Sequence, residues 1–201
     1  GVLMTRLLLL LLTSSATLLV FGLWIPLKAV IAQELLAIAW AESQARQTES
    51  RPWPWADTWP VARLVLQPDE DGDGSRQSLI VLDGAHGESL AFGPGQVVGG
   101  DQNAGPTVIA GHRDTHFRSL EHLETGATLK LQSRGGQWRS FRISSTRVVD
   151  SRYHRINESM LPRDSLLLVT CYPFNSIEAN GPLRYVVYAE AIGSELAAVV
   201  E

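Results

Sequence analysis

Residues 165–171 read SLLLVTC, an apolar run that ends on the single cysteine of the chain. Short apolar runs bounded by Gly, Pro, Asp and Ser are typical of β-strands. Such runs recur from Val61 onward and give eight strand candidates: VARLVL (61–66), SLIVLD (78–83), PTVIAGH (106–112), ATLKLQS (127–133), QWRSFRI (137–143), STRVVD (145–150), SLLLVTC (165–171) and LRYVVYAEA (183–191). Eight strands are enough to close a small barrel. We therefore predict a mainly β fold, a closed eight-stranded barrel, over residues 61–193.

The segments between the candidate strands predict turns and little helix. Residues 134–136 read RGG and are typical of a hairpin turn, and the GPG sequence at 93–95 is also expected to form a turn. Short helices are predicted at 117–123 and near 158–161. Residues 194–201 are expected to be a C-terminal tail.

The front of the chain is strongly apolar. Residues 7–27 contain no charged side chain, and as a helix they would extend about 31 Å, the thickness of a bilayer core. We therefore predict a single-pass transmembrane anchor over residues 1–32. The alternative is a signal peptide, because residues 30–32 resemble a small-residue cleavage site. Arg6 and Lys28 flank the apolar stretch on opposite sides, so charge alone does not fix its orientation.

Residues 33–60 connect this anchor to the barrel. Apolar residues at helical spacing predict a juxtamembrane helix from Ala29 to about Ser50. The following sequence, RPWPWADTWP (51–60), contains three prolines that end the helix and three tryptophans. Tryptophan favours the membrane–water boundary, but it also packs well against the wall of a barrel, and both interpretations of this strap remain open.

Composition limits the partners of the chain. It has 201 residues, with 17 Lys and Arg against 21 Asp and Glu and a formal net charge of −4. Because no broad basic field exists, we expect no nucleic-acid partner. The single cysteine, Cys171, cannot form an internal disulfide, and a lone thiol in an exported protein is open to oxidation. Cys171 is therefore either a small buried hydrophobic residue or a functional thiol.

Three reactive residues fall at the ends of candidate strands. His112 closes one, Cys171 closes another, and Arg184 opens the last. In a barrel, ends that are far apart in sequence meet at one rim, so the three side chains are expected to meet. The alternatives are a turn histidine and a structural arginine. Because Val186 and Tyr188 share the face of Arg184, we expect Arg184 to be partly buried and to have an anionic partner.

Together these three residue types suit acyl transfer. A thiol becomes a strong nucleophile when a nearby cation lowers its pKa, and histidine can pass a proton to a departing amine. The planar guanidinium can hold the oxyanion that forms when a carbonyl is attacked.

The local sequences around these residues resemble the sortase family of cysteine transpeptidases. LVTC (168–171) resembles the family's strand ending in Thr-Cys, and CYPF (171–174) resembles its continuation. AGHRDTHF (110–117) resembles the catalytic-histidine motif, in which the first histidine is the functional one. Arg184 follows on the next strand, as the family's arginine does. WPWADTWPVARL, ending at Leu64, is similar to the lead-in of sortases from Gram-negative marine proteobacteria, whereas Leu167 replaces a threonine found in many members.

This resemblance implies a fold, an activity and a location. It implies the sortase barrel, a membrane anchor, and a catalytic domain on the extracytoplasmic, periplasmic side of the cell membrane. The implied catalytic residues are Cys171, His112 and Arg184, with Thr170 and Tyr172 in substrate-binding or supporting roles. The implied substrates are a secreted protein with a C-terminal sorting signal and an amine acceptor. No cofactor or metal is implied.

Other functions remain as alternatives. One alternative is another Cys/His acyl-transfer enzyme, such as an L,D-transpeptidase. The Ser-x-Gly-Cys context of that class is missing around Cys171, however. A non-catalytic, membrane-anchored β-barrel that binds a cell-envelope partner is the alternative from another class. Neither His112 with His116 nor the acidic run at 69–74 predicts a metal site: the first lacks a matching third ligand, and the second lacks the downstream glutamate of a calcium loop.

Overall fold

The computed structural model describes residues 1–68, 75–87, 89–99, 105–176 and 181–193. The acidic run at 69–74 lies outside the described residues. In chain order the elements are α1 (Val2–Arg46), β1 (Pro60–Pro68), β2 (Ser75–Asp83), α2 (Ser89–Phe92), β3 (Gly95–Val98), β4 (Thr107–Ala110), η1 (Arg118–His122), β5 (Thr128–Ser133), β6 (Trp138–Asp150), η2 (Glu158–Met160), β7 (Ser165–Cys171) and β8 (Leu183–Ala191).

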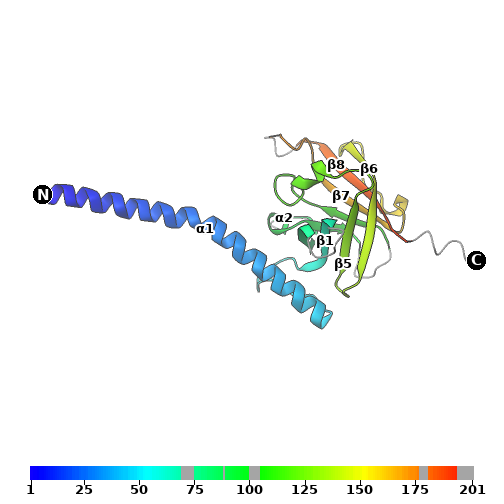
Figure 1. Cartoon of the computed structure of the whole chain (residues 1–201), viewed down its shortest axis with the longest axis horizontal. Helices are drawn as coiled ribbons and strands as arrows, with labels where there is room; N and C mark the ends of the chain where they lie inside the picture. Colours follow the sequence, from blue (N-terminus) through cyan, green and yellow to red (C-terminus); the bar gives the residue numbers. More distant parts are fainter. Residues whose placement is uncertain (69–74, 88, 100–104, 177–180, 194–201) are drawn as a thin grey trace, which may run out of the picture.

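The strands form a closed barrel in the order β1-β2-β3-β4-β7-β8-β6-β5 (Figure 1). The β2–β3 and β4–β7 pairs are parallel, and the other strand pairs are antiparallel. The prediction of a closed eight-stranded barrel is confirmed. The predicted turn at 134–136 is also confirmed, because the Gly136 N–H donates to the Ser133 carbonyl at 2.9 Å between β5 and β6.

Two strand assignments made from the sequence were wrong. The segments 137–143 and 145–150 are one strand, β6, which passes through a β-bulge between Ile143 and Ser145. The bulge interrupts the alternation of side chains without ending the strand. The sequence pattern therefore looked like two separate strands. Conversely, β3 was missed because its four residues, GQVV, lie among glycines that predicted only turns. Short helix α2 was also missed, whereas η1 and η2 were expected.

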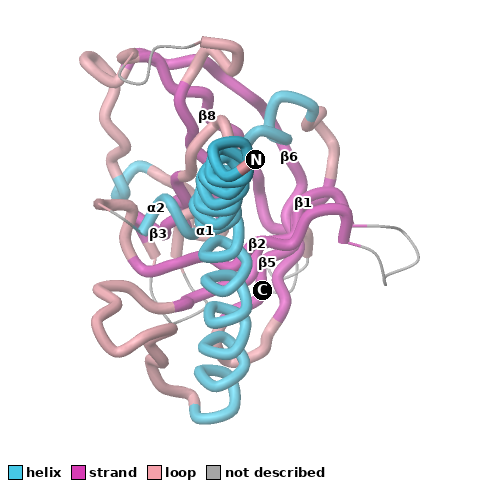
Figure 2. The backbone as a smooth tube through the Cα atoms, turned by 90° about the vertical axis from the view of Figure 1, so that its left-hand side faces the viewer, coloured by secondary structure: helices cyan, strands magenta, loops and turns pink. Residues whose placement is uncertain are grey.

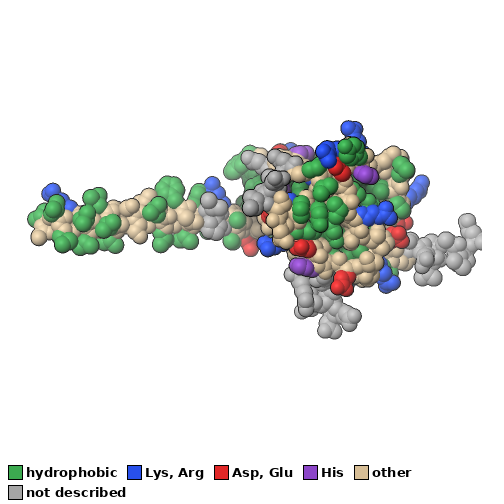
Figure 3. All heavy atoms as spheres, turned by 90° about the horizontal axis from the view of Figure 1, so that it is seen from above, with side chains coloured by type: hydrophobic (Ala, Val, Ile, Leu, Met, Phe, Trp, Pro, Cys, Tyr) green, Lys and Arg blue, Asp and Glu red, His purple; other side chains and the backbone are tan. Residues whose placement is uncertain are grey.

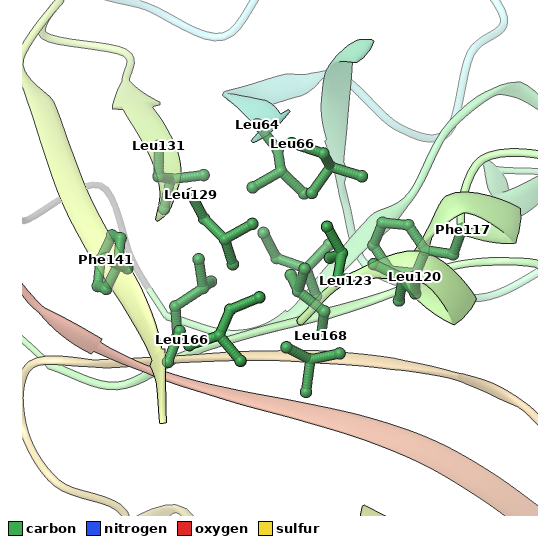
Figure 4. Packing of buried hydrophobic residues seen from close by; sticks show 14 of the residues in the cluster. Leu64, Leu66, Phe117, Leu120, Leu123, Leu129, Leu131, Phe141, Leu166 and Leu168 are labelled. Atoms are coloured by element: carbon green, nitrogen blue, oxygen red, sulfur yellow. The ribbon is translucent and has the colours of Figure 1, made fainter. Parts of the chain in front are cut away.

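The barrel interior is filled by inward-facing side chains of alternating strand positions, many of them leucines (Figure 4). Leu64, Leu129 and Leu166 are fully buried there. The segment from Phe117 through η1 closes one end, since Phe117 and Leu120 are also fully buried. This packing fixes the chain between β4 and η1, which includes His112.

Helix α1 has an exposed part and a packed part. Its N-terminal half projects away from the barrel, and hydrophobic side chains cover it (Figures 1 and 3). It is long and apolar enough to cross a membrane, and its most apolar window is not buried by the rest of the chain. The C-terminal half crosses the barrel (Figure 2), where Leu36 and Trp40 are each 1% exposed. The helix expected from Ala29 onward is thus confirmed, and it continues the apolar segment without interruption.

The Trp/Pro-rich strap packs against the barrel. Trp53 contacts the edge of the Phe92 ring at a centroid distance of 5.0 Å. The Thr58 hydroxyl donates to the Asp83 carbonyl at 2.9 Å, which fastens the strap to the end of β2. Trp55, by contrast, is 82% exposed. Trp53 thus packs on helix α2 beside the barrel, whereas the exposed Trp55 leaves the interpretation as a membrane-boundary residue open.

Candidate active site

Cys171 and Arg184 lie opposite each other on neighbouring strands. They are partners in the antiparallel β7–β8 ladder. On its other side β7 runs parallel to β4, with Ala110 beside Val169, and the Gly111 N–H donates to the Val169 carbonyl at 3.0 Å. His112 follows the last paired residue of β4 by two positions, so it lies beyond the same end of these parallel strands as Cys171. The three residues therefore lie at the same end of three adjacent strands.

The same residues share the outer face of the barrel. Leu166 and Leu168 belong to the interior cluster, whereas Leu167 belongs to a second cluster outside. Because side chains alternate along a strand, Cys171 falls on the face of Leu167. Arg184 likewise falls on the face of Val186. We call this second set the outer cluster; it comprises Val108, Leu167 and Val186 with Val98, Val149, Leu161, Val169 and Tyr188 packed against them.

Gly111 explains how His112 is held at the surface. A Cβ atom at Gly111 would come within 2.8 Å of the Phe117 ring, so only glycine leaves room for Phe117 to close the barrel. The Thr170 hydroxyl donates to the Gly111 carbonyl at 2.7 Å. Thr170 is itself buried, so it joins the strand of Cys171 to the segment of His112 rather than facing solvent.

The three candidate side chains are accessible to different degrees. His112 is exposed, whereas Cys171 and Arg184 are half-buried. Cys171 is a free thiol. Arg184 donates through Nη1 to the carbonyls of Gly181 and Leu183, at 2.6 and 2.9 Å. The expectation of an anionic partner was wrong: among the described residues no carboxylate pairs with Arg184, and carbonyl oxygens orient it instead. No carboxylate of the described residues therefore neutralises its positive charge.

Arg113 was not assigned a role from the sequence, yet it links the two halves of the site. It is 5% exposed. Its Nη1 and Nη2 atoms donate to the carbonyls of Pro173 and Ser176, at 2.9 and 2.7 Å. These carbonyls belong to the loop that follows Cys171, whereas Arg113 is the residue after His112. The hydrogen bonds of Arg113 thus connect the loop after Cys171 to the segment that contains His112.

Tyr172 faces the other aromatic residues at the end of the barrel. Its ring stacks on Tyr185 at a centroid distance of 6.4 Å and meets the edge of Phe174 at 6.2 Å. Its N–H donates to the Leu183 carbonyl at 3.0 Å, which extends the β7–β8 ladder past Cys171. This arrangement favours a supporting role for Tyr172.

Two titratable groups near the site have shifted pKa values. Burial, followed by repulsion from His112, lowers the pKa of His116, so its ring is neutral at pH 7. At the end of β6, hydrogen bonds from Arg152 lower the pKa of Asp150 to about 2. The Arg152 Nη2 atom lies 2.6 Å from the Asp150 carboxylate. This pair shapes the beginning of the connection between β6 and β7.

Comparisons with known proteins agree with this arrangement. The family model described as the sortase domain matches residues 74–192. Sortase D of Bacillus subtilis (strain 168) is 33% identical over 117 residues, which is 57% of this chain and 58% of that protein. The match therefore spans less than two thirds of this relative.

Solved structures share the fold. A Sortase D5 transpeptidase of Clostridium perfringens superposes with a TM-score of 0.57 at 17% identity, covering 82% of this chain and 99% of that one. Sortase A of Corynebacterium diphtheriae superposes with a TM-score of 0.54 at 20% identity, covering 69% and 63%. At these identities the likeness concerns the barrel alone.

Proposed function

The chain belongs to the sortase family of transpeptidases, and from this premise we propose that it is a membrane-anchored cysteine transpeptidase acting on a C-terminal sorting signal of secreted proteins. The observation that supports this most strongly is the pairing of Cys171 with Arg184 across β7 and β8, with His112 two residues beyond the same end of parallel strand β4. A sulfur, an imidazole and a guanidinium held by carbonyl oxygens suit acyl transfer.

In the first half of the proposed reaction, the Cys171 thiolate attacks a backbone carbonyl carbon of the sorting signal. The carbonyl oxygen becomes an oxyanion, which the Arg184 guanidinium stabilises. His112 donates a proton to the leaving nitrogen as the C–N bond breaks. The products are a thioacyl-enzyme and a released C-terminal peptide.

In the second half, an amine acceptor attacks the thioester carbon. His112 accepts the proton from this amine, and the C–S bond breaks to restore the thiolate. The substrate is then joined to the acceptor through a new amide bond. If water attacks instead, the product is the free carboxylic acid.

We expect the substrate peptide to lie against the apolar side chains of the outer cluster. Val169 and Val186 pair with each other on the same face as Cys171 and Arg184, two register positions away from them. Beyond them a cavity of about 280 Å³ is lined by Leu161, Leu167 and Tyr188, among others. An extended sorting signal would bury its apolar side chains against the outer cluster and in this cavity.

Helix α1 would anchor the enzyme. Its exposed apolar half favours insertion in the cell membrane, with the barrel on the extracytoplasmic, periplasmic side where secreted substrates are found. Residues 1–32 would form the anchor, residues 33–60 the connection and residues 61–193 the catalytic barrel. The relation to sortases of Gram-negative marine proteobacteria stays a prediction.

The activity is tested directly with peptides. The full-length enzyme is incubated with a library of short peptides and hydroxylamine, a small amine nucleophile. We expect hydroxamate products cleaved at a preferred sequence, detected by mass spectrometry. If no peptide is cleaved, and a thiol-reactive probe finds Cys171 inert across pH, the chain is a non-catalytic barrel.

Replacing Arg184 with lysine should lower kcat/KM by about 10²- to 10³-fold, because lysine keeps the charge but loses the planar fork that holds an oxyanion. The measurement is steady-state peptide turnover. Arg142→Lys, an exposed arginine on neighbouring β6, is the matched control and should remain active. Near-normal turnover in Arg184→Lys would remove Arg184 from the mechanism.

Arg113 is expected to act as a positioning residue. Arg113→Gln loses both bonds to the loop after Cys171 and should lower kcat about tenfold or more with a smaller change in KM, since misplacement of reacting groups slows chemistry. Arg118→Gln, an exposed arginine nearby, is the control. A lower melting temperature with unchanged kcat would show that Arg113 is only structural.

A further inference from the structure

A cavity lies where α1 crosses the barrel, apart from the thiol site. Its volume is about 210 Å³, and its walls come from α1, β1, β2, the end of α2 and the loop after β4. Gln33, Arg63, Ser78 and His116 supply its polar side chains, and Phe92 is among its apolar ones. The proposed transpeptidation uses none of these residues.

Arg63 lacks the hydrogen-bond acceptors that Arg184 and Arg113 possess. It projects from β1 on the outer side, under α1, and is half-buried. Within the described parts of the chain it makes no hydrogen bond or ion pair, and its Nε atom is fully buried without a partner. Arg184 and Arg113, in contrast, donate to carbonyl oxygens. A guanidinium N–H that is buried without an acceptor is costly, so a ligand that supplies an acceptor to Nε would be stabilised here.

The other polar groups of the cavity suit an anion. Its described lining contains no carboxylate. His116 is neutral at pH 7 because burial and His112 lower its pKa, so Arg63 carries the one full charge of this lining. The Ser78 hydroxyl and the His116 ring add hydrogen-bonding capacity. The Gln33 amide is held by its bond to the Phe92 carbonyl at 2.9 Å, which also fixes α1 against α2.

We propose that this cavity binds a phosphate group, and that its source is the headgroup of a membrane glycerophospholipid. A guanidinium matches the geometry of phosphate oxygens and binds them bidentately. The apolar part of the lining, including Phe92, would contact the glycerol backbone. This site goes beyond the transpeptidase function and depends only on the placement of α1 in the membrane.

The location of the cavity favours the lipid source. Leu27 ends the apolar stretch of α1, and Gln33 lies about 9 Å beyond it along the helix. The polar layer of a bilayer leaflet extends roughly 5 to 8 Å beyond the hydrocarbon core. Gln33 therefore lies just outside this polar layer when α1 spans the membrane, so the cavity that it shares with Arg63 borders the lipid headgroups. A bound headgroup would fix how the barrel sits on the membrane surface.

The test uses the full-length chain in an uncharged detergent. One arm measures by native mass spectrometry how much phosphatidylglycerol or phosphatidylcholine the protein retains. A second arm titrates glycerol phosphate, with acetate at equal ionic strength for comparison, and follows the melting temperature. We expect Arg63→Gln to retain about tenfold less lipid than the unchanged protein, since charge-assisted bonds to phosphate are lost. Arg118→Gln, an exposed arginine near the cavity, should retain lipid normally.

Each outcome decides between the sources. Lipid retention that depends on Arg63 supports the headgroup, and Arg63→Lys, which keeps the charge, should partly restore it. Stabilisation by glycerol phosphate alone, dependent on Arg63, would support a phosphate site but overturn the lipid source. Equal behaviour of Arg63→Gln and Arg118→Gln, or equal stabilisation by acetate, would overturn the phosphate site. Because no arm measures turnover, the result is independent of the transpeptidase activity.

Discussion

Replacing Cys171 with alanine is expected to abolish transpeptidation, lowering the rate by about 10⁴-fold or more. The thiolate would be the group that forms the covalent intermediate, and no other cysteine exists in the chain to replace it. The barrel should remain folded, because Cys171 lies at the end of β7 on the outer face and is only half-buried. The measurement is hydroxamate formation from the preferred peptide.

A matched change on the same strand controls for packing. Val169→Ala removes an outer-face side chain two residues before Cys171 and should keep the thioacyl intermediate, although substrate affinity falls. The melting temperature of Cys171→Ala should change by less than about 5 °C. Turnover within tenfold of the unchanged enzyme in Cys171→Ala would contradict the assignment of the nucleophile.

His112→Gln should lower kcat by about 10²- to 10⁴-fold, the range that a general acid and base contributes. Glutamine keeps a similar size and a hydrogen-bonding end but cannot exchange a proton at neutral pH. Because His112 is exposed at the end of β4, the substitution should leave the fold unchanged. The rate at which a thiol-reactive probe alkylates Cys171 should also fall, since the imidazole no longer assists ionisation.

His122→Gln is the control for this substitution. His122 is exposed in η1 and makes no contact with the proposed reaction. It should have normal turnover and a normal profile of probe reactivity against pH. If His112→Gln and His122→Gln behave alike in both assays, His112 is not the acid and base of this site.

The ends of β7 and β8 were well predicted from the sequence because both strands are rich in apolar and β-branched or aromatic residues and begin directly after a polar or proline residue. Their bounds in the structure, Ser165–Cys171 and Leu183–Ala191, equal the predicted ones. The total of eight strands was also right, but two errors compensated: β6 was counted twice and β3 was missed. A bulge and a four-residue strand between glycines produce no clear alternation of side chains.

The contacts of the arginines could not be predicted for a different reason. Arg113 donates to carbonyls far away in sequence, and every residue has a carbonyl, so no residue pattern marks such a partner. Arg63 lies at an outward position of β1, where an arginine is ordinarily solvated. Only the packing of α1 against the barrel buries it. Likewise, the placement of His112 at the same end of the barrel as Cys171 depends on the β4–β7 register, which pairs strands separated by two others in the chain.

The most direct measurement is to trap the acyl-enzyme and locate the modified atom. The enzyme is mixed with the preferred peptide without an amine acceptor, quenched in acid, digested and sequenced by mass spectrometry. We expect the N-terminal part of the peptide to be attached through a thioester to Cys171 of the unchanged enzyme. An adduct on any other residue, or peptide cleavage that persists in Cys171→Ser, would contradict it.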